Sequence, residues 1–177
     1  MENRNMWIIY ALLAALFWGM YAIAAKIIST SGYNIPSNIS FFLIFAGIGI
    51  VAIVYFLFSA KNFDWKVKIL GILILIVLLG YINLIIKKSI PETPLHIIAI
   101  GILSGILWGL GQMMGLFAFQ NGGIASKAVP IFNSNTLIVV IVGIIFLKEA
   151  PATNMAEWIK FVTGIIGIIL GGILLSK

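Results

Sequence analysis

The sequence predicts an all-α, polytopic transmembrane helix bundle with about six spans. Composition is the first observation: 62% of the 177 residues are hydrophobic and 9% are charged, whereas about a quarter of the residues in an average soluble domain are charged. The second observation is a set of long, continuously apolar runs. Strands of a membrane barrel alternate instead, and every backbone amide in hydrocarbon needs an internal partner, so these runs are expected to be helices in lipid.

Six apolar runs are each long enough to cross a membrane, because about 20 apolar residues span about 30 Å of hydrocarbon. The connections between them are short and carry turn-forming or interfacial residues. We therefore expect one integral membrane domain over residues 1–177, and whether the third run crosses completely is left open. The predicted spans are Met6–Ile28, Ile39–Ala60, Val67–Ile86, Leu95–Phe119, Ala125–Leu147 and Trp158–Leu175.

The charged and metal-ligating residues exclude several function classes. The net charge is +6, and the basic residues stand between the apolar runs rather than in one block, which is typical of membrane anchors and not of a nucleic-acid surface. The chain has no cysteine and one histidine, His96. It shows no catalytic triad, carboxylate pair within the spans or phosphate-binding loop. We expect no metal, no cofactor and no enzymatic activity, and a location in the cell membrane with the lipid bilayer as partner.

The basic residues are divided almost evenly between the two sides of the membrane. Positive charges normally gather on the cytoplasmic side, so this division specifies orientation only weakly and slightly favours both termini inside. It also permits a dual topology, in which two copies assemble antiparallel. One side carries Arg4, Lys61, Lys66, Lys68, Lys127 and Lys177, and the other carries Lys26, Lys87, Lys88, Lys148 and Lys160.

The two halves of the chain resemble each other at an offset of 90 residues. The pair Trp18-Gly19 recurs as Trp108-Gly109, and Gly32 recurs as Gly122. The alternative is chance, since apolar helices share a small alphabet. A true repeat would comprise residues 6–88 and 95–177, with three spans each. Three crossings invert the second copy, and inverted repeats are a common design of secondary transporters.

Glycines at helical spacing mark places where helices can pack closely, because there is no hydrophobic force between helices in lipid and small residues permit contact. The fourth span has glycines at every fourth position, and the sixth span has a similar pair. The expected helix-packing residues are Gly101, Gly105, Gly109, Gly167 and Gly171.

Polar residues inside the fifth span form the densest polar group, in the stretch "SKAVPIFNSNT" from Ser126 to Thr136. Pro130 cannot donate to the carbonyl of Ser126, and four polar residues follow it near the middle of the span. One interpretation is interhelical hydrogen bonding that holds the bundle together. The other is a locally broken helix that faces a substrate near the midplane.

Two further faces carry polar or aromatic residues. Ser104, Trp108 and Gln112 share one face of the fourth span, and Trp18, Ala22 and Lys26 share the matching face of the first span. Lys26 can alternatively extend its side chain to the lipid headgroups. The candidate substrate-binding residues are Trp18, Lys26, Trp108, Gln112, Asn133 and Asn135.

Several of these stretches resemble a known family. "ALLAALFWGMYAIAAKI" is similar to the opening helix of EamA-type proteins of the drug/metabolite transporter superfamily. "GLFAFQNGGIASKAVPIFNSNTLIVVIVGIIFLKE", followed by "GIIGIILGGILL", resembles the closing helices of an EamA repeat, and "ILWGLGQMMGLFAFQNGG" is also similar to sugar-uptake relatives. The resemblance implies export or uptake of small metabolites, usually by ten spans in two five-span repeats, with short relatives acting as dimers. The run Val67–Ile86 has no counterpart in that pattern.

We therefore expect a transporter or permease of small metabolites that works as a homodimer, because one six-span chain is small for enclosing a solute cavity. The alternative is a non-transporting membrane scaffold or accessory subunit. The polar group of the fifth span distinguishes the two: pairing with neighbouring helices favours the scaffold, and a water-accessible cavity favours transport.

Overall fold

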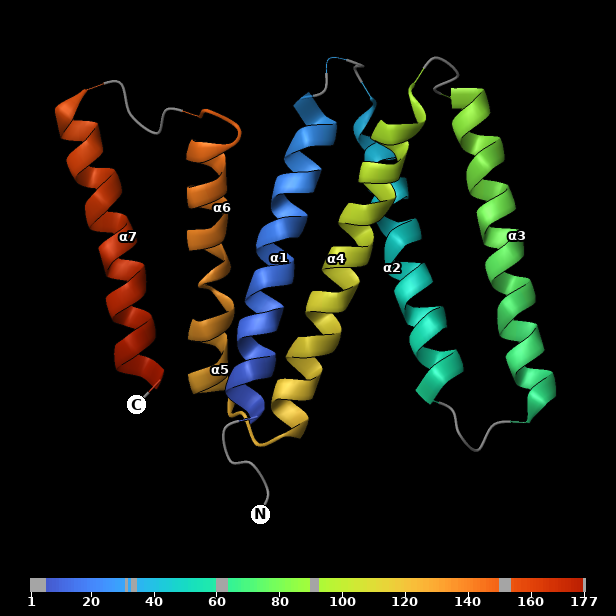
Figure 1. The fold of residues 1–177 in the computed structure, drawn as a ribbon, viewed down its shortest axis with the longest axis horizontal. Helices are drawn as coiled ribbons and strands as arrows, with labels where there is room; N and C mark the ends of the chain where they lie inside the picture. The colour runs from blue at the N-terminus through green and yellow to red at the C-terminus, as the bar shows by residue number, and fades with distance from the viewer. Residues whose placement is uncertain are drawn as a thin grey trace. The chain divides into compact units, whose positions relative to one another are not determined.

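The computed structural model describes residues 6–30, 32, 35–59, 64–89, 93–149 and 154–176. Within these residues the chain forms seven helices and no strand (Figure 1). Six helical stretches are long and apolar enough to cross a membrane, which confirms the predicted all-α, multi-pass fold. The helices are α1 (Met6–Thr30), α2 (Ser37–Ser59), α3 (Trp65–Ser89), α4 (Leu95–Gln120), α5 (Ala125–Phe132), α6 (Asn135–Ile145) and α7 (Met155–Ser176).

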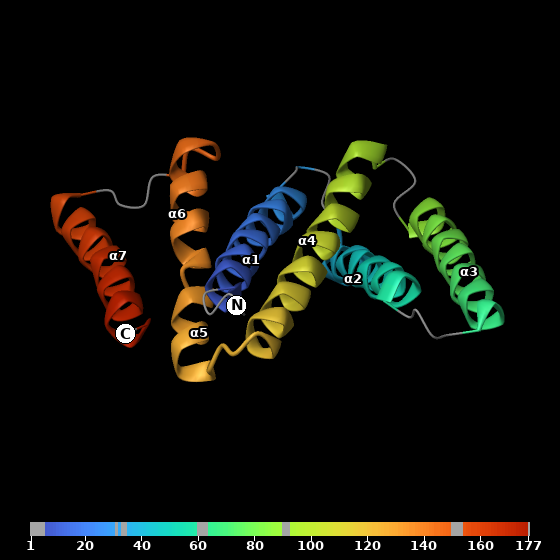
Figure 2. The same ribbon diagram turned by 60° about the horizontal axis from the view of Figure 1, so that its bottom comes forward.

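The fifth predicted span differs from the others because it is divided into α5 and α6, which follow one another end to end in both views (Figures 1 and 2). The other predicted spans each correspond to one continuous helix. α3 has 25 residues, or about 37 Å at 1.5 Å per residue. It is therefore long enough for the complete crossing that the sequence left open.

Contacts divide the chain into two compact units whose boundaries fall inside α1 and α4. Unit 1 comprises Met1–Ile23 and Leu110–Lys177, and unit 2 comprises Ala24–Gly109. Unit 1 thus combines most of α1 and the second part of α4 with α5, α6 and α7. Unit 2 combines the end of α1 and the first part of α4 with α2 and α3. Each unit therefore draws helices from both halves of the sequence.

Unit 2 is held together by contact between the backbones of α2 and α4. A Cβ added to Gly105 would overlap the carbonyl oxygen of Ile44, and one added to Gly47 would overlap that of Ile102. Only glycine permits this approach, which allows dispersion contacts along both helices. Leu43 lies fully buried beside this contact. α3 packs along α2, and Ile82 is its one buried residue within Trp65–Ser89.

Unit 1 has a core built mainly from alanines, which again lets helices approach closely. Ala11 and Ala14 of α1 are completely buried, together with Ala118 of α4 and Ala128 of α5. Phe132, at the end of α5, fills the space among them. α7 packs along α5, but no residue of Met155–Gly172 is buried. The last helix is therefore attached without an apolar core of its own.

The first helix of each half is followed by a glycine in the left-handed conformation. Gly32 follows α1 with φ +76°, and Gly122 follows α4 with φ +93°. L-residues with a side chain rarely adopt such values, whereas glycine adopts them freely. The two positions lie 90 residues apart.

Candidate functional site

The fifth span is interrupted after Phe132, where the spacing of the backbone hydrogen bonds changes. The amide of Asn133 still donates to the carbonyl of Val129, four residues back, at 3.0 Å. The amide of Ser134 donates only three residues back, to the carbonyl of Ile131 at 3.1 Å. Bonds of this shorter spacing tighten the turn. The predicted local break in the helix is therefore present.

The break changes the hydrogen bonding of two carbonyl groups. Pro130 has no N–H, so the carbonyl of Ser126 lacks the amide that normally bonds to it. The carbonyl of Pro130 does not accept a hydrogen bond from the amide of Ser134, because that amide donates to the carbonyl of Ile131 instead. An acceptor without a donor is costly in hydrocarbon. Neither carbonyl accepts the usual amide four residues further on, so each keeps an acceptor position that a hydroxyl can use.

The four polar side chains at the break differ in their hydrogen bonding. The hydroxyl of Ser134 donates to the carbonyl of Ile131 at 2.6 Å, and the hydroxyl of Thr136 donates to Oδ1 of Asn135 at 3.3 Å. Asn133 is exposed, and its carboxamide makes no hydrogen bond to any residue that the structure describes. Asn133 therefore offers a donor and an acceptor to a ligand.

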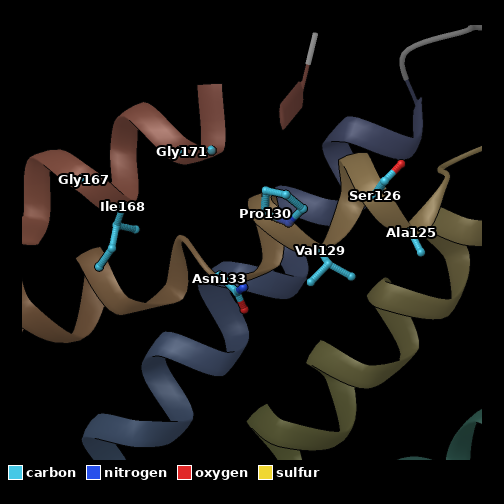
Figure 3. A pocket seen from close by; sticks show the side chains of 9 residues that line it. Ala125, Ser126, Val129, Pro130, Asn133, Gly167, Ile168 and Gly171 are labelled. Atoms are coloured by element: carbon cyan, nitrogen blue, oxygen red, sulfur yellow. The ribbon is translucent and has the colours of Figure 1, made fainter. Parts of the chain in front are cut away.

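A cavity of about 630 Å³ lies between α5, the break and α7. Figure 3 shows Asn133 and the residues of α5 on one side, with the glycine-containing face of α7 on the other. Gly167 and Gly171 have no other atom within 4 Å of an added Cβ, so their missing side chains contribute room. The lining is uncharged: Ala125, Ser126, Val129, Pro130, Asn133, Gly167, Ile168, Gly171 and Gly172.

A second cavity, of about 320 Å³, shares three of these residues, namely Pro130, Ile168 and Gly172. It is lined further by α1 and α6, and the side chains of Ser134 and Trp7 supply its polar groups. The carbonyl oxygen of Pro130 lies 3.9 Å from a Cβ added to Gly172, which is ordinary contact distance. The two cavities therefore adjoin where α5 meets α7.

Trp18 of α1 lies against the break through an unusual contact. Its ring packs edge-on to Phe132, with the ring centroids 5.4 Å apart, and a Cβ added to Gly111 would lie 2.6 Å from its Nε1. Nε1 is buried and has no hydrogen-bond partner among the described residues. A buried donor without an acceptor costs about 1–3 kcal/mol. This indole N–H is therefore a buried donor that the described residues leave unsatisfied.

The six candidate binding residues are distributed over both units. Trp18, Asn133 and Asn135 lie in unit 1 around the break, and a Cβ added to Gly19 would lie 3.3 Å from the carbonyl oxygen of Asn135. Gln112 is also in unit 1, but it is exposed on α4. Lys26 is exposed and Trp108 is half-buried, both in unit 2. The structure thus brings together three of the six.

The glycines expected to mediate packing have two different surroundings. Added Cβ atoms would lie 2.8 Å from Leu43 at Gly101 and 3.1 Å from Val51 at Gly109, and Gly105 contacts the backbone of α2 as described above. Gly167 and Gly171 border the larger cavity instead. Sequence spacing alone does not distinguish these surroundings.

Several residues that line the larger cavity or form the contact between α2 and α4 were not predicted individually from the sequence. Gly47 forms the α2 side of the contact between α2 and α4. The pair of small residues Ala46-Gly47 is the sequence feature that could have indicated it. Val129, Ile168 and Gly172 line the cavity. Apolar residues and glycines of this kind occur throughout the chain, so no sequence pattern marks these three.

Comparison with known proteins identifies relatives by sequence alone. No family model matches the chain, and no solved structure matches it. An uncharacterized protein of Methanocaldococcus jannaschii is 37% identical over 110 residues, which cover 61% of this chain and 74% of the archaeal protein. The chain belongs to the family of this archaeal protein.

Members of a second group of relatives carry a functional name. Several proteins of Streptococcus pyogenes called "Putative sugar uptake protein" are 38% identical to the chain over 72 residues. The match covers 41% of this chain but 24% of each streptococcal protein, so those proteins are longer. The chain therefore shares a segment with them, whereas it shares most of the length of the archaeal relative.

Proposed function

We propose that the chain is a membrane transporter of small metabolites that binds its solute at the break between α5 and α6. One observation carries this proposal: the carboxamide of Asn133 makes no hydrogen bond to the described residues, and it lines a cavity of about 630 Å³ within a membrane-spanning stretch. Polar groups inside a span are costly unless they have partners. A site of this kind is suited to a solute that supplies the missing hydrogen bonds.

The chemistry of the cavity favours an uncharged, hydroxyl-bearing solute. No charged residue lines it. Asn133 can donate and accept, the hydroxyl of Ser126 can do the same, and the carbonyl of Pro130 can accept from a hydroxyl. The names of the streptococcal relatives agree with this chemistry, so sugars and polyols are the first solutes to test. The resemblance to EamA-type transporters supports small metabolites more generally.

The broken span also supplies a place where the molecule can change shape. Discontinuous helices at the solute site are common in secondary transporters, whose halves move against the site. α7 is attached without buried residues, and it forms one wall of the cavity. In this proposal a shift of α7 along α5 opens and closes the larger cavity.

We further propose that the transporter is a homodimer in the plasma or inner membrane. A chain of 177 residues is small for enclosing a pathway by itself, and the streptococcal proteins that share one segment with it are longer. Two copies with six candidate spans each would supply twelve spans around a shared pathway.

Uptake into vesicles tests the proposal. The purified chain is reconstituted and offered labelled sugars, polyols, amino acids and nucleosides, with empty vesicles as the control. We expect saturable uptake of at least one neutral polyhydroxy solute and its loss in Asn133→Leu, while Asn121→Leu, exposed after α4, retains uptake. If neither the wild-type chain nor Asn121→Leu takes up any of these solutes in vesicles where both are folded, the result would contradict transport.

Cysteine accessibility distinguishes a transporter from a scaffold. Because the chain has no native cysteine, single cysteines at 133 and 135 can be labelled with a membrane-impermeant thiol reagent. A solute cavity predicts labelling at 133 that the transported solute slows. A scaffold predicts that neither position is labelled, since both side chains would contact neighbouring helices.

A further inference from the structure

A groove in unit 2 lies between α3 and α4, away from the residues assigned to solute binding. Its volume is about 370 Å³. The α3 residues that line it recur at intervals of three and four, which places them on one face of the helix. The groove is lined by Leu79, Ile82, Asn83, Ile86 and Lys87 of α3, by Thr93, and by Leu95, Ile98 and Ile102 of α4.

The polarity of this groove changes along its length. Lys87 lies at the end of α3, in its last turn, and Asn83 lies one helical turn deeper. Below Asn83 the walls are aliphatic, and Leu79 and Ile102 lie at the far end. Eight residues separate Leu79 from Lys87, which corresponds to about 12 Å along the helix axis. The groove thus has a cation, Lys87, at the end of α3 and an apolar lining that extends from there along the helix.

This profile matches the profile of a phospholipid. Lipid phosphates lie at the level where a membrane-spanning helix ends, and acyl chains extend from there into the hydrocarbon. Lys87 is exposed, as is the neighbouring Lys88, and basic residues near the membrane surface attract anionic lipids. Asn83 can donate to an ester carbonyl one turn below the phosphate.

We propose that the groove between α3 and α4 binds an anionic phospholipid, with its phosphate at Lys87 and one acyl chain along Leu79, Ile82 and Ile98. α3 buries only Ile82 among its own residues, so an acyl chain in the groove adds apolar contact between α3 and α4. The lipid therefore holds α3 against the rest of unit 2. The site is independent of solute transport.

The same observations argue against other occupants. A free inorganic phosphate would meet one cation and a long aliphatic surface that it cannot use. A neutral sugar would leave most of its hydroxyls facing leucine and isoleucine side chains, where they lack partners. A zwitterionic lipid has an equivalent chain but a weaker attraction to Lys87. These occupants are the competing outcomes of the experiment.

Lipid binding to the purified chain in neutral detergent tests the proposal. Retention of phosphatidylglycerol and of phosphatidylcholine is measured by native mass spectrometry, with inorganic phosphate as competitor. Lys87→Gln removes the cation, and Lys88→Gln is its matched control, because Lys88 does not line the groove. Leu79→Trp fills the apolar end while leaving both charges in place.

We expect the chain to retain phosphatidylglycerol better than phosphatidylcholine, and inorganic phosphate not to displace it. Lys87→Gln should weaken retention about fivefold, as expected for one basic residue at an anionic surface, and Leu79→Trp should weaken it with the charges intact. Equal losses in Lys87→Gln and Lys88→Gln, equal retention of the two lipids, or displacement by phosphate would each overturn the proposal.

Discussion

Glycines at similar spacing in α4 and α7 have opposite surroundings. A Cβ on Gly105 would overlap the backbone of α2, whereas one on Gly164, Gly167 or Gly171 would meet no other atom within 4 Å. In α4 the absent side chain permits contact between two backbones, and in α7 it leaves room beside a cavity. Glycines at helical spacing thus leave room on one face of a helix, and the position of the neighbouring helix determines whether that room is filled.

The largest effect is expected for Gly105→Ala. The added methyl group would meet the carbonyl of Ile44, and backbone cannot yield as a flexible side chain can. We expect a loss of about 3 kcal/mol in stability, measured by thermal unfolding of the detergent-solubilised chain. Gly164→Ala is the matched control and should unfold at the wild-type temperature or slightly above it, because no atom obstructs its methyl group and alanine favours a helix. Equal unfolding of Gly105→Ala and the control would contradict the contact between α2 and α4.

A smaller loss is expected for Gly111→Ala. Its methyl group would press against the indole of Trp18, a side chain that can shift. We expect a loss of about 2 kcal/mol, and the added change Trp18→Phe should recover most of it because phenylalanine is smaller. A double-mutant cycle in thermal unfolding measures this coupling. Simple additivity of the two changes would show that the residues do not meet.

Pro130→Ala should separate stability from transport. Alanine supplies the N–H that the carbonyl of Ser126 lacks, so we expect a gain of about 1 kcal/mol together with slower solute uptake, because the break becomes stiffer. Unfolding and vesicle uptake are measured on the same preparation. Pro36→Ala, at an exposed position before α2, should leave uptake unchanged. Undiminished uptake in Pro130→Ala would mean that transport does not need proline at this position.

The smallest effect on the fold is expected for Gly167→Ala. No atom obstructs the methyl group, and alanine favours the helix by up to about 1 kcal/mol, so the unfolding temperature should stay level or rise. The methyl group enters the larger cavity, so the half-saturating solute concentration should change about threefold. An unfolding temperature well below that of the wild type would show that α7 contacts another helix through this face.

Much of the fold follows from the sequence because one requirement dominates it: apolar runs of sufficient length must satisfy their backbone groups internally in lipid. The break near Pro130 is equally local, since proline and the polar residues after it act within one turn. The spans and the break were therefore predictable. The division of the fifth span at Phe132 and Asn135 depends on the shift in hydrogen-bond spacing, which proline alone does not locate.

The cavity is less predictable than the break, because its second wall comes from a distant helix. Ile168 and Gly172 lie 35 and 39 residues after Asn133, and nothing in their local sequence indicates which face of α7 meets α5. The partner of Gly105 was hidden for the same reason. Gly47 belongs to another span, and each glycine is required only because the two helices bring their backbones into contact at this point.

Amide hydrogen exchange will be fastest, among the membrane-spanning helices, in α7. A helix with no buried residue over Met155–Gly172 separates from its neighbour without exposing a core, so its opening requires little free energy. The alanine core around Phe132 opens only when unit 1 unfolds as a whole. Within unit 1, α7 should therefore detach before the alanine core around Phe132 unfolds.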